Sequence, residues 1–140
     1  MEQTFIIIKP EAVKRGLVGE ILHRLERRGL KILHLQMTKV SRDLAREHYK
    51  HHADKPFFPG LLDAITAGPV VMAVLEGPAA VAVVRNLVGA TDPAKAAPGT
   101  IRGDFGEELP FNMVHASDSP ETAAEEMERF FGFRQAPAWD

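Results

Sequence analysis

The sequence contains no cysteine, so disulfides, thiol nucleophiles and cysteine-ligated metal sites are all excluded. It also lacks any stretch that approaches the roughly 18 apolar residues of a membrane-spanning helix. The N-terminal residues MEQTFIIIKP have too short an apolar run for a signal peptide, and no basic flank precedes it. We therefore expect a cytoplasmic protein that makes no contact with a membrane.

An excess of positive charge is missing as well. The net charge is −2, whereas the phosphate backbone of nucleic acids is bound by clustered positive charge. An RNA-binding sheet would also need exposed aromatic residues on its central strands, which the apolar runs TFIIIK and PVVMAVLEG do not offer. We expect no specific binding of nucleic acid.

The common glycine-rich and catalytic motifs are absent too. The chain has neither of the phosphate-binding patterns GxxxxGK[ST] and GxGxxG. It also has no GxSxG nucleophile elbow and no HExxH zinc motif. If this protein handles nucleotides, it must do so by other means.

The length and composition of the chain indicate a single domain. Its 140 residues are enough for one domain with a real core and too few for two typical ones. Hydrophobic residues make up 45% and charged residues 26%, which is typical of a soluble globular protein. We expect one domain over residues 1–140, with an irregular tail from about residue 133 to 140.

Hydrophobic patterns predict the secondary structure. β-branched runs or alternating apolar residues predict strands at 4–9, 33–38, 69–77 and 111–114. Helical spacing and capping residues predict helices at 17–28, 42–49, 57–67, 79–88 and 120–131. With the short helices left aside, the order is β-α-β-β-α-β and then a final helix. We expect an α+β fold of the ferredoxin-like type, a four-stranded antiparallel sheet with helices on one face.

Residues 90–110 have no convincing periodicity and contain several prolines and glycines. A loop of this length in a compact domain is uncommon, and such a loop is usually functional or disordered. Thr91, Arg102 and Asp104 lie within it, and a disordered linker would not need them. We expect an irregular loop that is functional and not merely a disordered linker.

His115 lies between an apolar segment and the polar residues Ser117, Asp118 and Ser119, which begin the last predicted helix. Helix N-termini attract anions, and a neutral imidazole is a competent nucleophile. A carboxylate two turns further on, Glu125 or Glu126, could fix the tautomer of the ring. Two interpretations remain, a packed structural histidine or an exposed nucleophile at an anion site, and local physics alone favours the first.

Five blocks of sequence resemble nucleoside diphosphate kinases. Residues 112–118, NMVHASD, resemble the N-x-x-H-x-S-D signature of that family. The other four blocks occur in the expected order and spacing: TFIIIKP, HYKHHADKPFFPGLL, GPVVMAVLEG and GATDPAKAAPGTIRGDF. The resemblance extends over essentially the whole chain. Five blocks in register make coincidence very improbable, and the resemblance reverses the choice for His115.

The resemblance implies an enzyme that transfers the γ-phosphate of a nucleoside triphosphate, mainly ATP, to a nucleoside diphosphate. The reaction would be ping-pong through a phosphohistidine on His115, with Mg²⁺ carried by the nucleotide. Glu126 would orient the histidine and Ser117 would bond that glutamate. Tyr49 and Lys9 would lie beside the transferred group. Bound partners would be ATP and other nucleoside tri- and diphosphates.

The resemblance also assigns the nucleotide site. The residues implied for the diphosphate are Arg85, Thr91 and Arg102, and those implied for the sugar 3′-hydroxyl are Lys9 and Asn112. Phe57 would stack on the base, with Leu61 and Leu109 as apolar neighbours. Asp118 would touch the metal only through water. Arginine forks suit phosphate oxygens, and stacking tolerates every base, so broad base and sugar tolerance follows.

Some features depart from the family pattern or stay open. Pro110 and Phe111 stand where the family often has Gly-Arg. Family members are tetramers or hexamers built from a common dimer, and we favour a hexamer. The alternative function is a non-catalytic ferredoxin-like module that binds nucleotides or proteins. His48, His51 and His52 have metal-ligand spacing, but we expect them on a solvated helix face.

Overall fold

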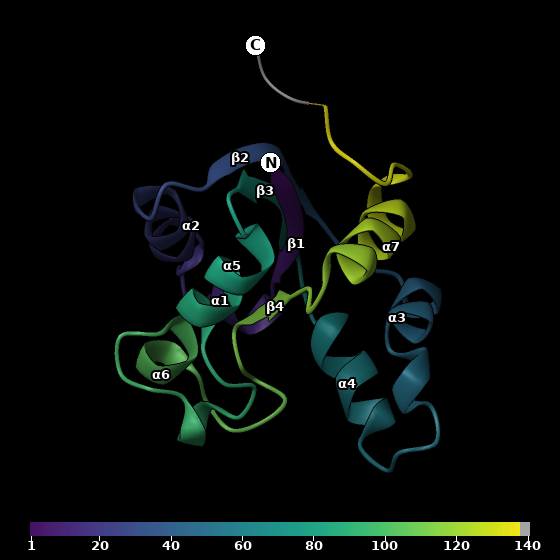
Figure 1. Ribbon diagram of the computed structural model, residues 1–140. Coiled ribbons are helices and arrows are strands. Elements are labelled where there is room, and N and C mark those ends of the chain that lie inside the picture. The colour runs from purple at the N-terminus through teal and green to yellow at the C-terminus, as the bar shows by residue number, and fades with distance from the viewer. Residues whose placement is uncertain (138–140) are drawn as a thin grey trace.

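The computed structural model describes residues 1–137 of the chain, and the main elements are labelled in Figure 1. The strands are β1 (Glu2–Ile8), β2 (Lys31–Thr38), β3 (Val70–Gly77) and β4 (Val114–Ala116). The α-helices are α1 (Pro10–Lys14), α2 (Val18–Arg27), α3 (Arg42–His48), α4 (Phe58–Ile65), α5 (Ala80–Val88), α6 (Ile101–Phe105) and α7 (Pro120–Phe131). Two single turns of 3₁₀-helix, η1 (Lys50–His52) and η2 (Pro93–Lys95), complete the set.

The four strands form one sheet in the order β2-β3-β1-β4, and each adjacent pair is antiparallel. Strand β1 pairs with β3 from Glu2 to Ile8 and with β4 from Ile6 to Ile8. Five of the seven residues of β1 are apolar or β-branched and fully buried, as a central strand requires. The α+β class and the four-stranded antiparallel sheet expected from the sequence are confirmed.

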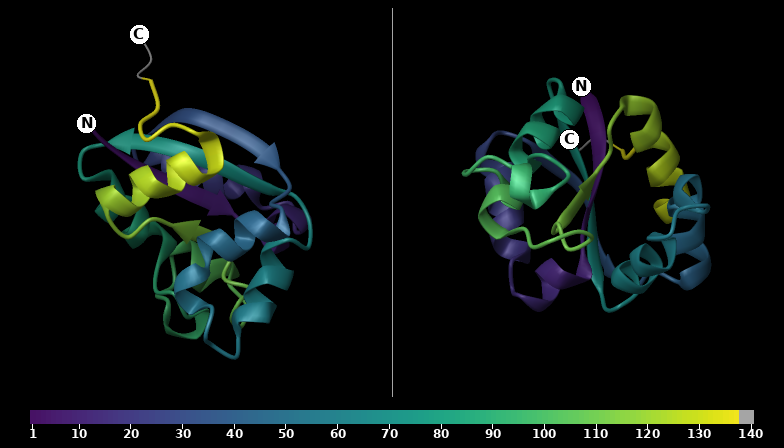
Figure 2. Two further views of the ribbon diagram at one scale, coloured as in Figure 1. Left: turned by 90° about the vertical axis from the view of Figure 1, so that its right-hand side faces the viewer. Right: turned by 90° about the horizontal axis from the view of Figure 1, so that it is seen from below.

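Helices cover both faces of this sheet, as the view from below shows (Figure 2). Along β1, Ile6 and Ile8 enter the core beneath α1, α2, α5 and α6. Phe5 and Ile7 point the other way, toward α3, α4 and α7, because successive strand residues face opposite sides. The expectation that the helices lie on one face is therefore wrong. The unbroken apolar run of β1 is the sequence signal for a strand buried on both sides.

Three further differences from the predicted elements concern short segments. Residues 90–110 are not irregular throughout, because η2 and α6 lie within them. Strand β4 covers Val114–Ala116 rather than residues 111–114, which places His115 within the strand. Helix α1 follows β1 directly at Pro10 and was missed. Each of these elements has only three to five residues, too few to show a period.

The C-terminal segment packs against the start of β1. The side-chain amide of Gln3 donates through Nε2 to the carbonyl of Ala136 at 2.9 Å and accepts through Oε1 from the N–H of Ala136 at 2.8 Å. Residues 133–137 contain no helix or strand, and residues 138–140 of the predicted tail lie outside the described residues. Within residues 1–137 no helix is both long and apolar enough to cross a membrane.

Candidate active site

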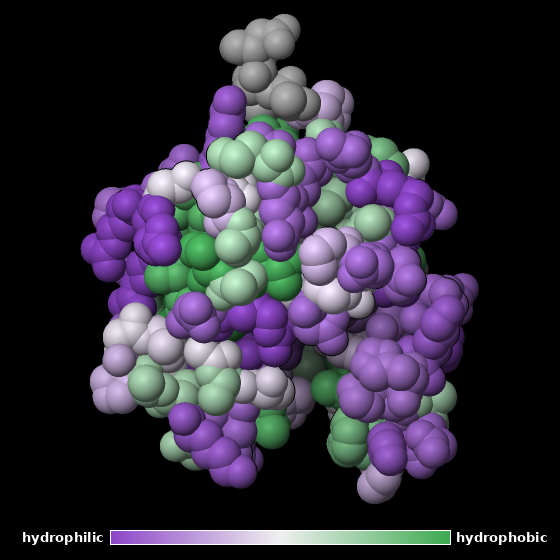
Figure 3. Space-filling model, viewed as in Figure 1, coloured by the Kyte–Doolittle hydropathy of each residue, from purple (hydrophilic) through white to green (hydrophobic). Residues whose placement is uncertain are grey.

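A cavity of about 1020 Å³ opens beside β4. Helix α4 and the segment that joins it to α3 form one wall, and the loops on either side of α6 form the other. The space-filling view shows the surface hollowed between these two walls (Figure 3). Between these two walls the cavity is lined by residues of β4 and α7. Segments far apart in the sequence therefore meet at one opening.

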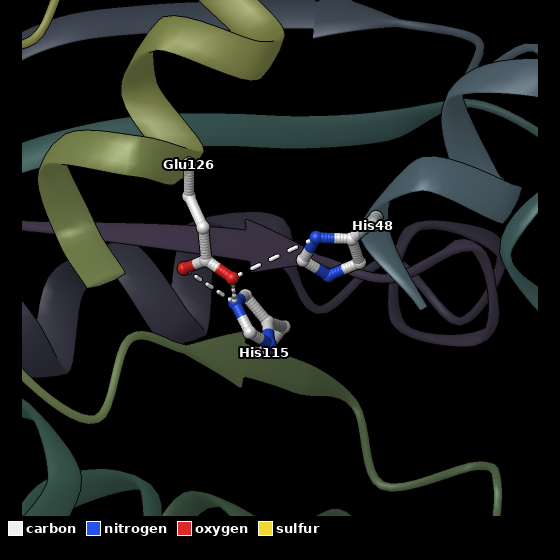
Figure 4. A group of neighbouring side chains, drawn as sticks. All are labelled: His48, His115 and Glu126. Carbon is white, nitrogen blue, oxygen red and sulfur yellow. Dashed lines mark hydrogen bonds and ion pairs between the residues drawn. The ribbon is translucent and has the colours of Figure 1, made fainter. Parts of the chain in front are cut away.

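His115 occupies the middle of β4 and lines this cavity. Its neighbours Val114 and Ala116 are buried in the core on the opposite side of the strand. The ring Nε2 of His115 lies 2.8 Å from Oε2 and 2.9 Å from Oε1 of Glu126. The other ring nitrogen, Nδ1, points away from that carboxylate (Figure 4). The side chain stays 24% exposed, so the ring is open to a ligand in the cavity.

Glu126 is a buried carboxylate on α7, and only 4% of it is exposed. Ser119 caps this helix, and the helical spacing then turns Glu126 toward the sheet beside Met127. The hydroxyl of Ser117 donates to Glu126 Oε1 at 2.5 Å. Ser117 and His115 together provide the hydrogen bonds that a buried charge requires. His115, Glu126 and Ser117 are thus joined by hydrogen bonds, and the catalytic roles expected for them stay predictions.

Lys9 places a buried ammonium group at the end of β1, only 5% exposed. Its Nζ donates to Asn112 Oδ1 at 3.0 Å and to the carbonyl of Pro110 at 2.5 Å, and lies 3.6 Å from Glu11 Oε2. Burial lowers the pKa of Lys9, and the nearby carboxylate of Glu11 opposes that shift. Asn112 in turn donates to the carbonyl of Thr91 at 2.9 Å. These contacts tie the loop around α6 to the sheet.

Arg102 is the second buried cation of the cavity, and it is held by three backbone carbonyls. It donates to Gly89 at 3.0 Å, to Asn112 at 3.3 Å and to Val114 at 2.6 Å. Burial, with a smaller effect from Arg85, lowers the pKa of Arg102 to about 10, so the group is still cationic at neutral pH. Arg85 on α5 donates to a carbonyl of β4 at 2.9 Å. Two guanidinium groups therefore line the cavity in fixed positions.

A family model described as nucleoside diphosphate kinase matches residues 2–135. The chain belongs to the nucleoside diphosphate kinase family. The chain is 62% identical over 131 residues to the nucleoside diphosphate kinase of Nocardia farcinica. The aligned region covers 93% of this chain and 94% of the relative. The enzyme of that name from Archaeoglobus fulgidus is 55% identical over 140 residues, or 100% of this chain and 93% of the relative.

A solved structure agrees with this assignment. The nucleoside diphosphate kinase of Halobacterium salinarum in complex with CDP has a TM-score of 0.94 at 47% identity, and covers 99% of this chain and 93% of that one. The nucleoside diphosphate kinase fold is therefore shared over essentially the full length. The family and the enzyme class expected from the sequence are confirmed.

Two large apolar side chains stand unusually exposed on the opposite walls of this kinase cavity. Phe57 is 51% exposed before α4, and Leu109 is 50% exposed on the loop after α6. Leu61 lies half-buried one turn after Phe57. The ring of His52 packs edge-on against Phe57 at 5.3 Å between centroids. The apolar pair offers a slot for a flat ring, and Phe57 is the aromatic side of it.

Tyr49 ends α3 beside the cavity and is half-buried. Burial raises the pKa of its hydroxyl, with smaller contributions from Glu11 and Glu126, so this group stays protonated and able to donate.

All the predicted site residues line the cavity except Ser117, which lies behind it and contacts Glu126. Asp118 lines the cavity as an exposed carboxylate.

His48 corrects one expectation from the sequence. It does not share a solvated face with His51 and His52, because it is only 5% exposed and lies against the catalytic histidine candidate. Its ring meets that of His115 edge-on at 4.7 Å between centroids. Helix α3 ends at His48 and η1 begins at Lys50, so the assumed helical spacing does not continue.

Arg129, one turn after Glu126 on α7, is a further cavity residue that sequence reasoning missed.

Among residues 1–137, one group has the ligand spacing of a metal site, namely His48, His115 and Glu126, whose ligand atoms lie within 4.8 Å of one another. This group does not fit a bound cation. His115 already pairs with Glu126, and the guanidinium of Arg129 donates to Nδ1 of His48 at 3.1 Å. A positive charge there repels a metal ion. Glu126 is better explained as the partner of the histidine.

Proposed function

We propose that this chain transfers the γ-phosphate of nucleoside triphosphates, mainly ATP, to nucleoside diphosphates through a phosphohistidine on His115. The observation that carries the proposal is the pairing of His115 Nε2 with Glu126 beneath a cavity lined by Lys9, Arg85 and Arg102. A hydrogen on Nε2 leaves a lone pair on Nδ1, the nitrogen that points away from the carboxylate. Nδ1 is therefore the nucleophile.

In the first half-reaction, Nδ1 attacks the γ-phosphorus, a nitrogen–phosphorus bond forms, and the bond to the bridging oxygen breaks. The nucleoside diphosphate leaves, and a second diphosphate takes the phosphoryl group from the same atom. Glu126 holds the proton on Nε2 and stabilises the positive charge that grows on the ring. Because donor and acceptor use one pocket in turn, no P-loop is required.

The cavity cations and hydroxyl group have the roles that phosphoryl transfer requires, namely positioning and charge stabilisation. Arg85 and Arg102 would hold the diphosphate oxygens, and Thr91 would contribute its hydroxyl group. Tyr49 and Lys9 would donate to the transferred group. Lys9 and Asn112, which are bonded to each other at 3.0 Å, would also bind the sugar 3′-hydroxyl.

A nucleotide kinase reaction typically needs a divalent cation, and we assign Mg²⁺. Mg²⁺ is usually held by nucleotide phosphates with one or two carboxylates and several waters. Asp118 is an exposed carboxylate on the cavity wall, which fits a contact through water and no direct ligation. The cation would supply charge neutralisation on the phosphates.

Base binding would use the slot between Phe57 and Leu109, with Leu61 beside it. The slot offers stacking surface rather than groups that read a base edge, so purines and pyrimidines should both be accepted.

We also propose a cytoplasmic homo-oligomer, a hexamer in preference to a tetramer. Leu35 and Met37 on the edge strand β2 are 51% and 60% exposed, which supports a subunit interface there. Native mass spectrometry would count the subunits.

The deciding experiment is mass spectrometry of the ATP-treated protein under alkaline conditions, with and without added GDP. We expect one acid-labile phosphate on His115 that disappears when GDP is added. His115→Gln should abolish both the label and turnover. Retention of full activity by this variant would refute the proposal, and ADP binding without any label would favour the non-catalytic nucleotide-binding module.

A further inference from the structure

Arg129 lines the edge of the cavity formed by α7, and its guanidinium is held by a histidine side chain. It follows Glu126 by one turn of α7, so the two side chains emerge on neighbouring positions of the helix. Its Nη1 lies 3.1 Å from Nδ1 of His48, and Arg129 itself is half-buried. The cavity cations Arg85 and Arg102, in contrast, are anchored to backbone carbonyls.

This contact decides the tautomer of His48. A guanidinium group has only donors and no acceptor, so Nδ1 of His48 must accept. The ring proton of a neutral His48 therefore sits on Nε2. Burial lowers the pKa of His48 well below its ordinary value, with smaller contributions in the same direction from His115 and Arg129, so the ring is neutral.

The same nitrogen faces the glutamate that holds the nucleophile. Nδ1 of His48 lies 3.6 Å from Oε2 of Glu126, and Oε2 lies 2.8 Å from Nε2 of His115. Figure 4 shows the two imidazole rings approaching this carboxylate from α3 and β4. A proton on Nδ1 of His48 would make that ring a second donor to Glu126 and a competitor of His115.

We propose that Arg129 is a positioning residue, which acts through His48 to reserve the carboxylate of Glu126 for His115. By donating to Nδ1, the guanidinium keeps the proton off the one atom of His48 that could compete for the carboxylate. The inference rests on the proposed role of His115 as the nucleophile. It gives a neutral buried histidine, and the arginine that contacts it, a defined part in phosphorylation.

The environment of His48 supports this reading. Its ring is enclosed by aromatic neighbours, edge-on to Tyr49 at 4.7 Å and to Phe130 at 5.2 Å between centroids, so it cannot easily rotate to exchange its nitrogens. The titratable and charged groups that act on it are Lys9 from the end of β1, Tyr49 and His51 from the end of α3 and from η1, His115 from β4, and Glu126 and Arg129 from α7.

The test compares Arg129→Met, which removes the donors and keeps much of the bulk, with Arg129→Lys, which keeps one cationic donor. Arg134→Met is the matched control, because Arg134 pairs with Glu128 on the surface and does not contact His48. Nitrogen-15 NMR, assigned with His48→Gln, reports the tautomer of His48 without any turnover. Single-turnover labelling by ATP and calorimetry with ADP report phosphorylation and binding separately.

In Arg129→Met we expect the His48 proton to move to Nδ1, and the phosphorylation rate to fall about 3- to 12-fold, as the loss of one hydrogen bond implies. ADP affinity should stay within twofold, the pH profile of the rate should shift, and Arg129→Lys should recover most of the rate.

An unchanged tautomer, or equal losses in rate and ADP affinity, would overturn the proposal. Labelling that survives in His115→Gln would instead refute the proposed function, while the NMR result would still stand.

Discussion

Replacement of Glu126 by glutamine tests the central pair with almost no change of shape. The amide keeps the size of the side chain but removes the buried negative charge that accepts from His115 and Ser117. Its NH₂ group can donate to Nε2 of His115, which would then place the ring proton on Nδ1, the attacking nitrogen. The substitution therefore weakens the nucleophile and the stabilisation of the charged ring together.

The size of the effect follows from the bonds that are lost. A hydrogen bond to a charged group contributes about 1.5–3 kcal/mol, so the loss of the His115–Glu126 pair in the transition state lowers the rate at least about 10- to 150-fold. Affinity for ADP should change little, since Glu126 is only 4% exposed and lies behind the ring. The loss should therefore fall on the chemical step.

Rapid-quench measurement of a single turnover with ATP, worked up in alkali, gives the phosphorylation rate, and calorimetry gives ADP affinity. Glu128→Gln is the matched control, because it makes the same substitution on an exposed position of α7. A wild-type rate of phosphorylation in Glu126→Gln would show that Glu126 does not orient His115. Parallel losses of rate and of ADP affinity would show instead that the cavity had been deformed.

Three further substitutions test other parts of the site. Arg102 bonds three carbonyls from three separate nitrogens, a spread that the single nitrogen of Arg102→Lys does not reproduce. Urea unfolding should show a loss of about 2–4 kcal/mol, and no loss would contradict the clamp. Since the pKa of His48 is lowered in the folded state, the unfolded chain binds the proton first as pH falls. Stability should be complete above about pH 6.5 and should decrease below it toward the folded pKa, by up to about 1.4 kcal/mol per pH unit. His48→Gln should remove that slope in unfolding curves taken at several pH values, and a slope that persists would point to another group. Phe57→Ala should weaken ADP, GDP and CDP about equally, by about 5- to 150-fold in calorimetry, and selective loss of one base would contradict simple stacking.

Much of the fold could be predicted because its long elements carry their own signals. The β-branched run of β1, the serine cap and proline that begin α7, and the glycines that end α2, α5 and α7 are all visible in the sequence. Strand β4 was misplaced because three residues have no period of their own. Pairing with β1, from Ile6 to Ile8, sets its register instead.

Helix α6 shows a different limit of sequence reading. Thr100 caps it by accepting from the N–H of Gly103, so a start signal is present. Five residues are too few for an amphipathic stripe, however, and the surrounding prolines and glycines hide the signal. Gly103 is required by packing, since a Cβ there would lie 2.0 Å from the carbonyl oxygen of Ala97. That contact is between backbone segments and leaves no pattern in the sequence.

The site likewise contains some residues that could be assigned from the sequence and others that could not. Most of the residues expected to face a nucleotide could be named from the family resemblance, because the five blocks of sequence include all of them except Arg85 and Leu109. His48 and Arg129 could not, because their importance comes from a contact between α3 and α7, 81 residues apart in the chain. From the sequence alone, a histidine at a helix end and an arginine on a helix are both expected to be solvated.

Arg102 connects the architecture of the site to its chemistry. Met113, between Asn112 and the start of β4, has a φ of 72°, which is unfavourable for a side chain with a Cβ and costs about 1–3 kcal/mol. Arg102 bonds the carbonyls on both sides of this residue, those of Asn112 and Val114. The same guanidinium that lines the cavity therefore holds the strained turn that leads into His115. If Arg102 also binds phosphate as proposed, a change there should alter both phosphate binding and the position of His115. Its kinetic effect can then be ascribed to phosphate contacts only when stability is measured beside it.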